Sequence, residues 1–417
     1  MRLSYTPPPG WDFVTVGDLA KPEKGSIRIG PFGSALKKHE YSENGIRVLG
    51  IEDVHPNQFL SNRCKYIPDA KFCELSQYEV SDGDVLVTNM GTVGRACAVP
   101  AGTQRSIISS HLIKVSLNRS RADPNYLCWM LNYSPLVVAQ IRAKSHGAIM
   151  AGFNSSLLKS LRIPLPPLAE QKRIAGILDA ADALRAKRRE AFAQLDILLQ
   201  STFLDTFGDP VTNPMGWEVR SLGELAVKKP NNGVFRRNPE YSENLDSGLR
   251  VVWVEELFRG NCIDISESRR LEASQTEIEK YGLLPGDLLF CRSSLKLGGI
   301  AYNNVFLGER EEALFECHLI RVSPRTDVVN PMFLNLQLRT VPMRALLKSK
   351  SKTATMTTID QKALSSVEVV VPPIGLQSRF AAVVDSVEQQ KARQHAHLTE
   401  LDTLFASLQS RAFRGDL

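Results

Sequence analysis

The chain has 417 residues, of which 43% are hydrophobic and 23% are charged, and its formal net charge is +6. This length leaves room for two or three globular domains. The sequence has no apolar run of bilayer-spanning length, no signal-peptide core within residues 1–9, and no CxxC pair among its seven scattered cysteines. These features argue against a membrane span, a disulfide framework and a zinc site, and they predict a protein of the reducing cytoplasm.

The positive excess is confined to one part of the chain. Residues 1–165 hold 19 Lys and Arg against 13 Asp and Glu, whereas the rest of the chain is balanced. Within residues 208–370 the positive charges cluster at 228–229, 236–237 and 344–352. Such a bias favours a polyanionic partner, although a modest excess is also common on solvated surfaces.

Two large segments, at 1–165 and 208–370, are predicted to be mixtures of short strands and helices. Turn residues bound short runs of β-branched and apolar residues. Strands are expected at 46–51, 85–88 and 112–116 in the first segment, and at 251–254, 288–291 and 319–322 in the second. Helices are expected at 124–132 and 331–339. Each segment is therefore predicted to be an α+β domain.

The chain repeats itself with an offset of 206 residues. The sequence of residues 165–174 recurs in degenerate form at 371–380, and the same offset relates Trp11 to Trp217. The apolar framework recurs while the intervening residues differ. A period this long does not describe a solenoid, and it predicts two equivalent domains that present different surfaces.

Each unit closes with a segment whose apolar residues alternate in steps of three and four, as in helices that pair in a coiled coil. The predicted helix-pairing residues are Ile174, Ile177, Ala181, Leu184, Leu195, Leu198, Phe380, Val383, Val387, Leu401, Leu404 and Leu408. Pro166-Pro167 and Pro372-Pro373 prevent these helices from starting further upstream.

The chain order sets the direction of the pairing. If the two helices pair with each other they run antiparallel, and roughly 35 residues at 1.5 Å per residue form a rod of about 50 Å. Both stripes are polar in the middle, at Arg188, Gln390, Gln394 and His397. These residues can set the register, hold a ligand, or face solvent or a partner.

Motifs for catalysis are missing from the sequence. It has neither a phosphate-binding P-loop nor a Gly-x-Gly-x-x-Gly fingerprint, and no His, Cys and Asp cluster with metal-ligand spacing. Asn213-Pro214 lacks the aromatic residue that amino-methyltransferases place after this dipeptide, so an interdomain turn is the better interpretation. His111 and His318 occupy equivalent positions at the start of apolar strands, where a structural role is more usual than a catalytic one.

Two glycine-containing loops follow equivalent predicted strands. Residues 89–95 and 292–298 combine flexible backbone with Arg, Asn, Ser or Lys side chains, which contact phosphates and base edges in protein–DNA complexes. For any single residue, a plain hairpin turn is an equally good interpretation. The recurrence of both loops with different side chains is the stronger signal.

With the Pro-Pro helix starts and the domain–helix–domain–helix order, the chain resembles the specificity subunit of type I restriction-modification systems over almost its whole length. The most specific stretch is 163–174 with its second copy, which departs from the first at Gly375-Leu376. The resemblance implies two similar α/β-type target recognition domains, at 1–165 and 208–370. It also implies two long spacer helices, at 166–207 and 371–417, that form an antiparallel coiled coil.

The resemblance also implies the function. Each recognition domain would read one half of a bipartite, asymmetric site in double-stranded DNA, and the helices would set the spacing and dock two modification subunits. Those methyltransferase partners would use S-adenosylmethionine to methylate adenine N6, and restriction subunits would add an endonuclease driven by ATP and Mg²⁺. The chain itself would bind no cofactor or metal and would catalyse nothing.

Candidate DNA contacts are basic or loop side chains in both domains. They are Lys37, Lys38, Asn89, Thr92, Arg95, Arg105, Lys144 and His146 in the first domain, and Arg236, Arg237, Arg292, Ser293, Ser294, Lys296, Lys350 and Lys352 in the second. Two other classes compete with this interpretation. One is a nuclease with duplicated DNA-binding domains, which requires a catalytic constellation that the sequence does not show, and the other is an assembly scaffold that binds only protein.

Overall fold

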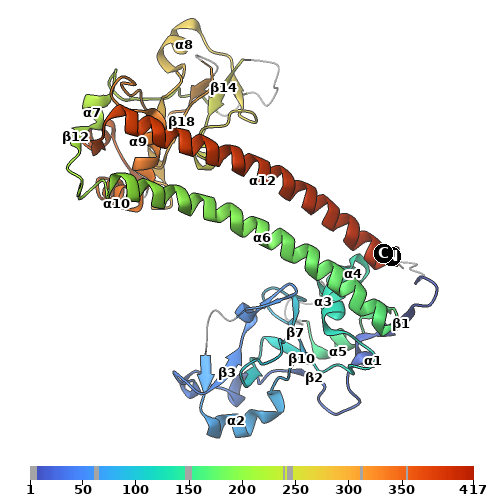
Figure 1. Cartoon of the computed structure of the whole chain (residues 1–417). Coiled ribbons are helices and arrows are strands. Elements are labelled where there is room, and N and C mark those ends of the chain that lie inside the picture. Colours follow the sequence, from blue (N-terminus) through green and yellow to red (C-terminus); the bar gives the residue numbers. More distant parts are fainter. Residues whose placement is uncertain are drawn as a thin grey trace. The chain divides into compact units, whose positions relative to one another are not determined.

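The computed structural model describes residues 7–60, 65–145, 153–237, 240–241, 248–309, 313–353 and 356–417. The chain divides into two compact units. Unit 1 comprises Met1–Lys187 and Leu398–Leu417, and unit 2 comprises Arg188–His397. The long helices α6 (Leu168–Phe207) and α12 (Ile374–Arg414) each contribute to both units (Figure 1). The four-segment division drawn from the sequence stays a prediction.

Unit 1 is built on a four-stranded antiparallel sheet in the order β2-β10-β7-β8 and a three-stranded sheet in the order β6-β3-β9. The bounds are β2 (Ile27–Ile29), β3 (Ile46–Leu49), β6 (Lys65–Ile67), β7 (Val85–Thr88), β8 (Ala96–Ala98), β9 (Ser106–Ile108) and β10 (Leu112–Val115). Strands β3 and β9 are parallel. Two small ribbons pair β1 (Asp12–Thr15) with β11 (Arg162–Leu165) and β4 (Val54–His55) with β5 (Gln58–Phe59).

The helices of unit 1 cover this framework. They are α1 (Val16–Leu19), α2 (Asp69–Leu75), α3 (Pro124–Tyr133), α4 (Pro135–Ser145) and α5 (Ser155–Lys159), with the first part of α6 and the end of α12. Asp123 caps α3 and Pro124 occupies its first turn, where a missing N–H costs nothing. The main core joins strand residues, α3, the start of α6 and Phe405 and Phe413 of α12.

Unit 2 repeats the same scheme. Its sheets have the orders β13-β20-β16-β18 and β15-β14-β19, with β14 and β19 parallel. The bounds are β13 (Asn231–Asn232), β14 (Leu249–Val252), β15 (Arg270–Leu271), β16 (Leu288–Cys291), β18 (Asn303–Val305), β19 (Ala313–Phe315) and β20 (Leu319–Val322). A ribbon pairs β12 (Glu218–Ser221) with β23 (Glu368–Val371). An additional small sheet joins β17 (Ser293–Ser294), β22 (Thr357–Thr358) and β21 (Lys352–Thr353) in that order.

The helices of unit 2 are α7 (Leu222–Leu225), α8 (Gln275–Tyr281), α9 (Pro331–Arg339), α10 (Val341–Ser349) and α11 (Gln361–Ser365), with the end of α6 and the first part of α12. Four phenylalanines from three helices form the centre of its core: Phe203, Phe207, Phe333 and Phe380. Their ring centroids lie 4.9–6.4 Å apart, a range typical of favourable aromatic pairs. The predicted mixed α+β architecture with two long helices is confirmed.

The repeated Pro-Pro motif has a structural explanation in a buried glutamine. Gln171 donates from Nε2 to the carbonyl oxygen of Pro166 at 2.8 Å, and its Oε1 accepts from the backbone N–H of Asp123 at 2.9 Å. Gln377 makes the equivalent bonds to Pro372 and Asn330. Both glutamines are fully buried. Each one therefore ties the start of a long helix to the N-cap of α3 or α9, satisfying backbone groups that would otherwise be buried without partners.

Four of the predicted helix-pairing residues are wrong, because the buried position follows them by one residue. Leu184, Leu198, Val383 and Leu404 are exposed by 46%, 50%, 44% and 54%. The buried or half-buried residues are instead Arg185, Leu199, Val384 and Phe405. The step from each preceding stripe residue is four rather than three in these places. Ile174, Phe380 and Val387 are buried, and Ile177, Ala181, Leu195, Leu401 and Leu408 are half-buried.

Equivalent ion pairs link the two helices within each unit. In unit 1, Arg185 of α6 contacts Asp402 of α12 at 2.6 Å and Asp182 at 2.7 Å. In unit 2, Lys391 of α12 contacts Asp196 of α6, and Glu388 at 2.8 Å. Within each unit the helices are antiparallel, as expected. The charged seam residues are Arg185 and Lys391 rather than the polar positions singled out from the sequence.

Candidate nucleic-acid interface

Unit 2 gathers several of the candidate DNA contacts on one small sheet. Strand β16 leads directly into Arg292 and β17 (Ser293–Ser294), which pairs with β22 (Thr357–Thr358), and β22 pairs with β21 (Lys352–Thr353). The β-branched threonines suit this extended hairpin. The main chain of Arg292 is held at both ends, because its N–H donates to the carbonyl oxygen of His318 at 2.8 Å and its carbonyl oxygen accepts from Ile359 at 3.0 Å.

A small basic pocket lies on this sheet. It has a volume of about 120 Å³ and is lined by Arg292, Lys350, Lys352, Thr358, Ile359 and Asp360. Lys350 follows the end of α10 and donates to Ser366 Oγ at 3.2 Å, so its ammonium group is positioned at this edge. Asp360 is occupied in capping α11, where it accepts from the N–H of Ala363 at 2.7 Å. Three cations and a hydroxyl around one hollow can bind an anionic oxygen such as that of a phosphate.

The loop that follows β17 presents its side chains outward. Ser294 Oγ bonds to the main chain of Lys296, with distances of 3.2 Å to its nitrogen and 2.8 Å to its oxygen. Leu295, Lys296 and Leu297 are exposed. A loop that satisfies its own backbone while exposing long side chains is suited to contact a large partner surface.

Arg236 and Arg237 are not part of this pocket. Arg236 pairs with Glu277 and lies 3.3 Å from Glu240, so its charge is already compensated by two carboxylates. The backbone N–H of Arg237 donates to Glu240 at 3.1 Å, and its side chain is exposed. Of these two, Arg237 is the better placed for contact with a polyanion.

The equivalent loop of unit 1 differs in the placement of its first residue. The N–H of Asn89 donates to the carbonyl oxygen of His111 at 3.1 Å, the bond that Arg292 makes with His318. However, Asn89 is only 4% exposed, and its Nδ2 donates to the carbonyl oxygen of Ser110 at 3.1 Å. The prediction that Asn89 contacts DNA is therefore corrected, because a buried amide that holds the loop is not available to a base edge.

The rest of this loop is a tight turn. Gly91 and Gly94 adopt φ angles of +72° and +85°, which favour glycine. Thr88 Oγ accepts from the N–H of Arg95 at 3.1 Å and closes the turn. Thr92 and Arg95 are half-buried, and Met90 and Val93 are exposed. The hairpin interpretation thus describes the backbone, while Thr92 and Arg95 stay candidates for contact.

The other candidates in unit 1 are dispersed. Lys37 and Lys38 are exposed beside a short 3-10 turn at Lys38–Glu40. Arg105 donates to Glu79 at 2.7 Å and lies 4.2 Å from the Phe72 ring centroid, and the hydrogen bond to Glu79 raises its pKa. Lys144 lies near the end of α4, and His146 lies outside the described residues. These last two precede Lys350 and Lys352 by 206 residues.

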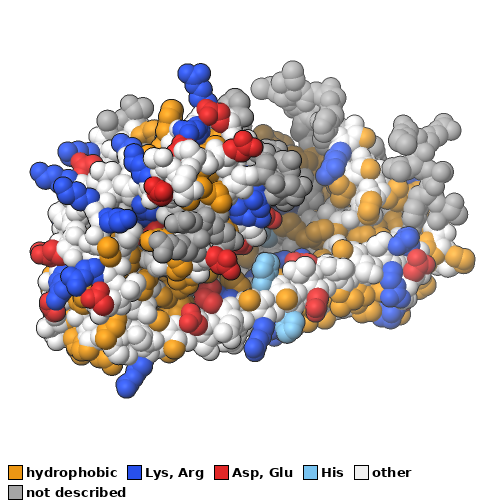
Figure 2. Space-filling model, turned by 90° about the horizontal axis from the view of Figure 1, so that it is seen from above, with side chains coloured by type: hydrophobic (Ala, Val, Ile, Leu, Met, Phe, Trp, Pro, Cys, Tyr) orange, Lys and Arg blue, Asp and Glu red, His pale blue; other side chains and the backbone are white. Residues whose placement is uncertain are grey.

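The charge on one face of the molecule is mixed rather than concentrated. On the face shown in Figure 2, Lys and Arg side chains are interspersed with Asp and Glu. Local pockets such as that around Arg292 therefore identify a candidate contact better than net charge does.

One group of side chains could supply metal ligands. The ligand atoms of Glu316, Cys317 and His318 lie within 4.8 Å of one another, a proximity that the sequence search did not predict. Burial raises the pKa of both the Glu316 carboxyl and the Cys317 thiol. Bound protons compete with a metal ion, and one Glu316 oxygen already accepts from the N–H of His318 at 2.8 Å. The group adjoins Arg292 through the His318 carbonyl.

Sequence reasoning missed one residue of this interface and four that hold the long helices. Thr358 lines the basic pocket, and Gln171, Gln377, Arg185 and Lys391 hold the long helices in place. The repeat contained the signal for these four, because each pair is separated by 206 residues and keeps its polar character. No helix in the described ranges is both long and apolar enough to cross a membrane.

Comparison with known proteins gives this architecture a class. Residues 8–191 match the model of the type I restriction modification DNA specificity domain. The EcoKI specificity subunit of Escherichia coli K12 is 27% identical over 310 residues, which cover 68% of this chain and 64% of that subunit. The EcoBI specificity subunit of Escherichia coli is 22% identical over 424 residues, covering 92% of this chain and 83% of that protein.

A solved structure extends the likeness to the fold of the whole chain. A chain from a study of complex assembly and conformational transition of the type I R-M system superposes with a TM-score of 0.56 at 22% identity, covering 99% of this chain and 100% of that chain. Residues 8–191 therefore match a type I restriction modification DNA specificity domain, and the chain as a whole is similar to type I restriction enzyme specificity subunits.

Proposed function

We propose that this chain selects the DNA sequence on which a type I restriction-modification complex acts, and that each unit reads one half of a bipartite, asymmetric site. The observation that carries the proposal is the pair of equivalent loops. Each leaves its strand through the same backbone hydrogen bond to a histidine carbonyl, yet Asn89 is buried whereas Arg292 is exposed, and the residues that follow them differ. One scaffold with two different contact surfaces suits two unlike half-sites.

In unit 2, the proposed contacts divide into two roles. Lys350 and Lys352 would anchor the DNA backbone, because ammonium groups bind phosphate oxygens without regard to sequence. Arg292, Ser293, Ser294 and Lys296 lie on or beside β17 and would read base edges, since arginine and lysine pair with guanine and serine accepts or donates to either base.

In unit 1, Thr92 and Arg95 are the proposed readers, and Lys37 and Lys38 the proposed phosphate contacts. Lys144 and His146 are proposed from their repeat relationship to the lysines of unit 2. Arg105 and Arg236 are weaker candidates, because Glu79 and Glu277 already bind them.

The long helices would set the half-site spacing and dock two modification subunits. Exposed apolar residues support a docking role: Leu184 and Leu404 in unit 1, and Ile197, Leu198, Leu204 and Val383 in unit 2. The family relationship implies that the docked subunits bind S-adenosylmethionine and methylate adenine N6. Restriction subunits would supply the ATP- and Mg²⁺-dependent cleavage, and the chain itself would catalyse neither step.

The test uses the purified chain with and without the modification subunit of its own system. With that subunit and S-adenosylmethionine, adenine methylation should appear at one split sequence, and specific DNA should compete better than random DNA in gel shifts. Cleavage or methylation by the chain alone with Mg²⁺ and S-adenosylmethionine would show an enzyme instead. If random DNA competed as well as specific DNA, the chain would be an assembly scaffold that binds only protein.

A further inference from the structure

Unit 2 contains a cleft of about 890 Å³ on the side of α9 that faces the long helices. Its lining includes Leu199 and Phe203 of α6, Lys391 of α12, and Leu336 and Thr340 at the end of α9. This volume falls in the range of clefts that bury a ligand. The cleft is separate from the basic pocket at Arg292, and the DNA-reading proposal makes no use of it.

The repeat explains why the cleft is open. In unit 1, Trp129 of α3 packs at 5.1 Å from Tyr133 and 5.8 Å from Phe405, and Arg185 lies 4.1 Å from the Phe405 ring centroid. The positions equivalent to these four residues are Leu336, Thr340, Leu199 and Lys391, and all four line the cleft. Three aromatic rings of unit 1 are therefore replaced by smaller side chains in unit 2.

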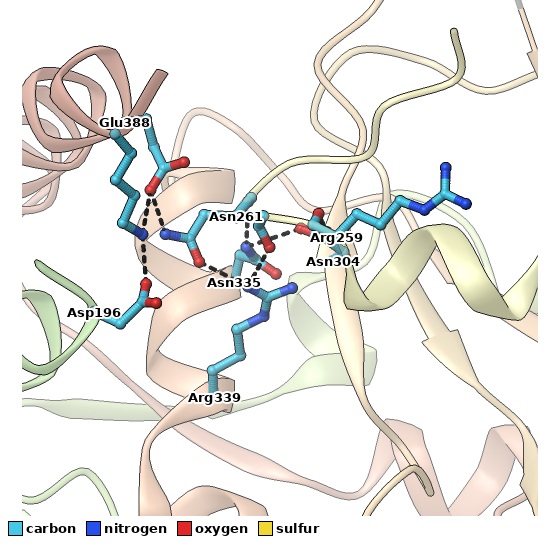
Figure 3. Close-up of polar contacts among 9 residues, drawn as sticks. Asp196, Arg259, Asn261, Asn304, Asn335, Arg339 and Glu388 are labelled. Atoms are coloured by element: carbon cyan, nitrogen blue, oxygen red, sulfur yellow. Dashed lines mark hydrogen bonds and ion pairs between the residues drawn. The ribbon is translucent and has the colours of Figure 1, made fainter. Parts of the chain in front are cut away.

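One wall of the cleft is polar. Its side chains hold one another in place through ion pairs and hydrogen bonds. Lys391 lies between Asp196 and Glu388, and Glu388 accepts from Asn261 Nδ2 at 2.7 Å. Asn261 in turn accepts from Arg339 Nη1 at 2.8 Å. Figure 3 shows Asp196, Glu388, Asn261 and Arg339 converging on this wall. Such a network holds its members in one arrangement.

The two arginines of the lining are also occupied. Arg339 donates to the carbonyl oxygens of Asn303 and Gly260, and Arg344 donates to those of Ala301, Gly298 and Ile300. Their guanidinium carbons lie 4.8 and 5.3 Å from the Tyr302 ring centroid. Since these cations already have partners, the wall favours a flat ring over a phosphate-bearing ligand.

An acceptor for a ring N–H is also present. In unit 1, Trp129 Nε1 donates to Asp179 at 2.8 Å. Asp385 is the equivalent of Asp179 and is exposed. Asp385 lies three residues before the lining residue Glu388 on α12, a spacing that places the two side chains beside each other on the helix.

The undescribed segments of unit 2 supply no ring for the cleft. Residues 238–239, 242–247, 310–312 and 354–355 of unit 2 are not described, and their sequences contain no aromatic residue. The exposed Ile197 lies three residues before the lining residue Gln200 on α6, a spacing that places the two side chains beside each other on the helix. An exposed apolar side chain next to the cleft lining fits a polypeptide better than a free small molecule.

We propose that this cleft receives an aromatic side chain, of the tryptophan or tyrosine type, from a protein that docks on the exposed apolar residues of α6 in unit 2. The docking protein rests on the proposed function, in which modification subunits bind the long helices. The aromatic anchor and its restriction to unit 2 go beyond that function. Unit 1 fills the equivalent space with its own Trp129 and so offers no such receptor.

The test uses N-acetyl-tryptophanamide as the probe and the full chain as the receptor. Ligand-observed NMR should detect binding with a Kd on the order of 1 mM, as expected for a single ring with few contacts. N-acetyl-leucinamide should bind at least fivefold more weakly. Leu336→Trp should fill the cleft and weaken probe binding at least tenfold, whereas the control Val219→Trp, at an exposed position of β12 outside the lining, should leave it unchanged. If Leu336→Trp does not fold, Thr340→Tyr replaces it.

Two results would overturn the proposal. One is equal probe binding by the wild type and a folded cleft-filling variant. The other is a modification subunit that binds the chain without displacing the probe, which would indicate a small-molecule site. Neither result bears on DNA selection, because methylation at a split sequence is measured separately. Loss of sequence selection with intact probe displacement would instead refute the proposed function alone.

Discussion

The loops at Asn89 and Arg292 leave equivalent strands through the same hydrogen bond, yet one side chain is buried and the other is exposed. In unit 1 the amide of Asn89 is used to hold its own loop through Ser110. In unit 2 the guanidinium of Arg292 joins Lys350 and Lys352 around a pocket. The difference shows that a duplicated backbone can keep its framework while the same position changes from support to contact.

The interiors of the two units differ in a complementary way. Unit 1 packs Trp129 against Tyr133 and Phe405, whereas unit 2 places Leu336 and Thr340 at the equivalent sites and leaves a cleft. Unit 1 thus packs its large side chains into its own core. Unit 2 satisfies the same helix junction with a polar network around Lys391.

The largest expected effect is a loss of stability on removing Trp129, whose equivalent position in unit 2 holds no aromatic ring. Trp129→Ala deletes a buried side chain and its hydrogen bond to Asp179, and it should lower the free energy of unfolding by about 3–5 kcal/mol. Leu336→Ala, at the half-buried equivalent position beside the cleft, should cost less than half as much. Chemical denaturation of both variants measures the difference, and equal losses would contradict the assignment of a filled and an open junction.

The next effect concerns the two loops. Arg292→Ala should cost about 1–3 kcal/mol in discrimination at one base of one half-site, seen as relaxed methylation by the reconstituted complex. Asn89→Ala should instead lower stability by about 1–2 kcal/mol through the lost buried hydrogen bond. If Asn89→Ala changed the base preference without loss of stability, Asn89 would contact DNA and would not act only as a structural residue of its loop.

A smaller effect is expected for the lysines of the basic pocket. Lys350→Ala and Lys352→Ala should each weaken DNA binding alike for all sequences and reduce the slope of log K against log salt by about 1. Arg236→Ala is the matched control, because Glu277 and Glu240 already compensate its charge. Fluorescence anisotropy across a salt series gives the slopes. A larger slope change for Arg236→Ala than for the lysines would argue against the pocket.

The smallest effect is a pH dependence that the two units share. Burial raises the pKa of Asp84 in unit 1 and of its equivalent Asp287 in unit 2 above the ordinary value of 3.8. The folded state therefore binds these protons more tightly, so their contribution to stability is present below pH 3.8 and is lost as pH rises through the folded pKa. Asp84→Asn and Asp287→Asn should each flatten the pH dependence of the unfolding free energy, and a steeper curve in either variant would contradict the sign.

The sequence predicted the framework better than the contacts. The repeat, the strands such as Val85–Thr88 and Leu288–Cys291, and the two long helices follow from local patterns and are seen in the structure. The buried side of each helix was predicted wrongly at Leu184 and Val383. Steps of three and of four are both compatible with a helical stripe, and only the tertiary partners decide which residue of an adjacent pair is buried.

The candidate site was predictable only in part. Arg292, Lys350 and Lys352 were named separately, but 57 residues separate Arg292 from Lys350, and only the pairing of β17, β21 and β22 brings them together. The burial of Asn89 depends on Ser110, and the pairing of Arg236 depends on Glu277. Such long-range contacts are set by the fold and leave no local signal.

The central claim is that two unlike readers on one scaffold select two unlike half-sites. Its most direct test is to map methylated adenines after reconstituting the modification complex with the wild-type chain and with Arg292→Ala. The wild type should give one split motif with an unread gap, and the variant should relax one half and leave the other intact. A continuous motif, or relaxation of both halves together, would contradict the account.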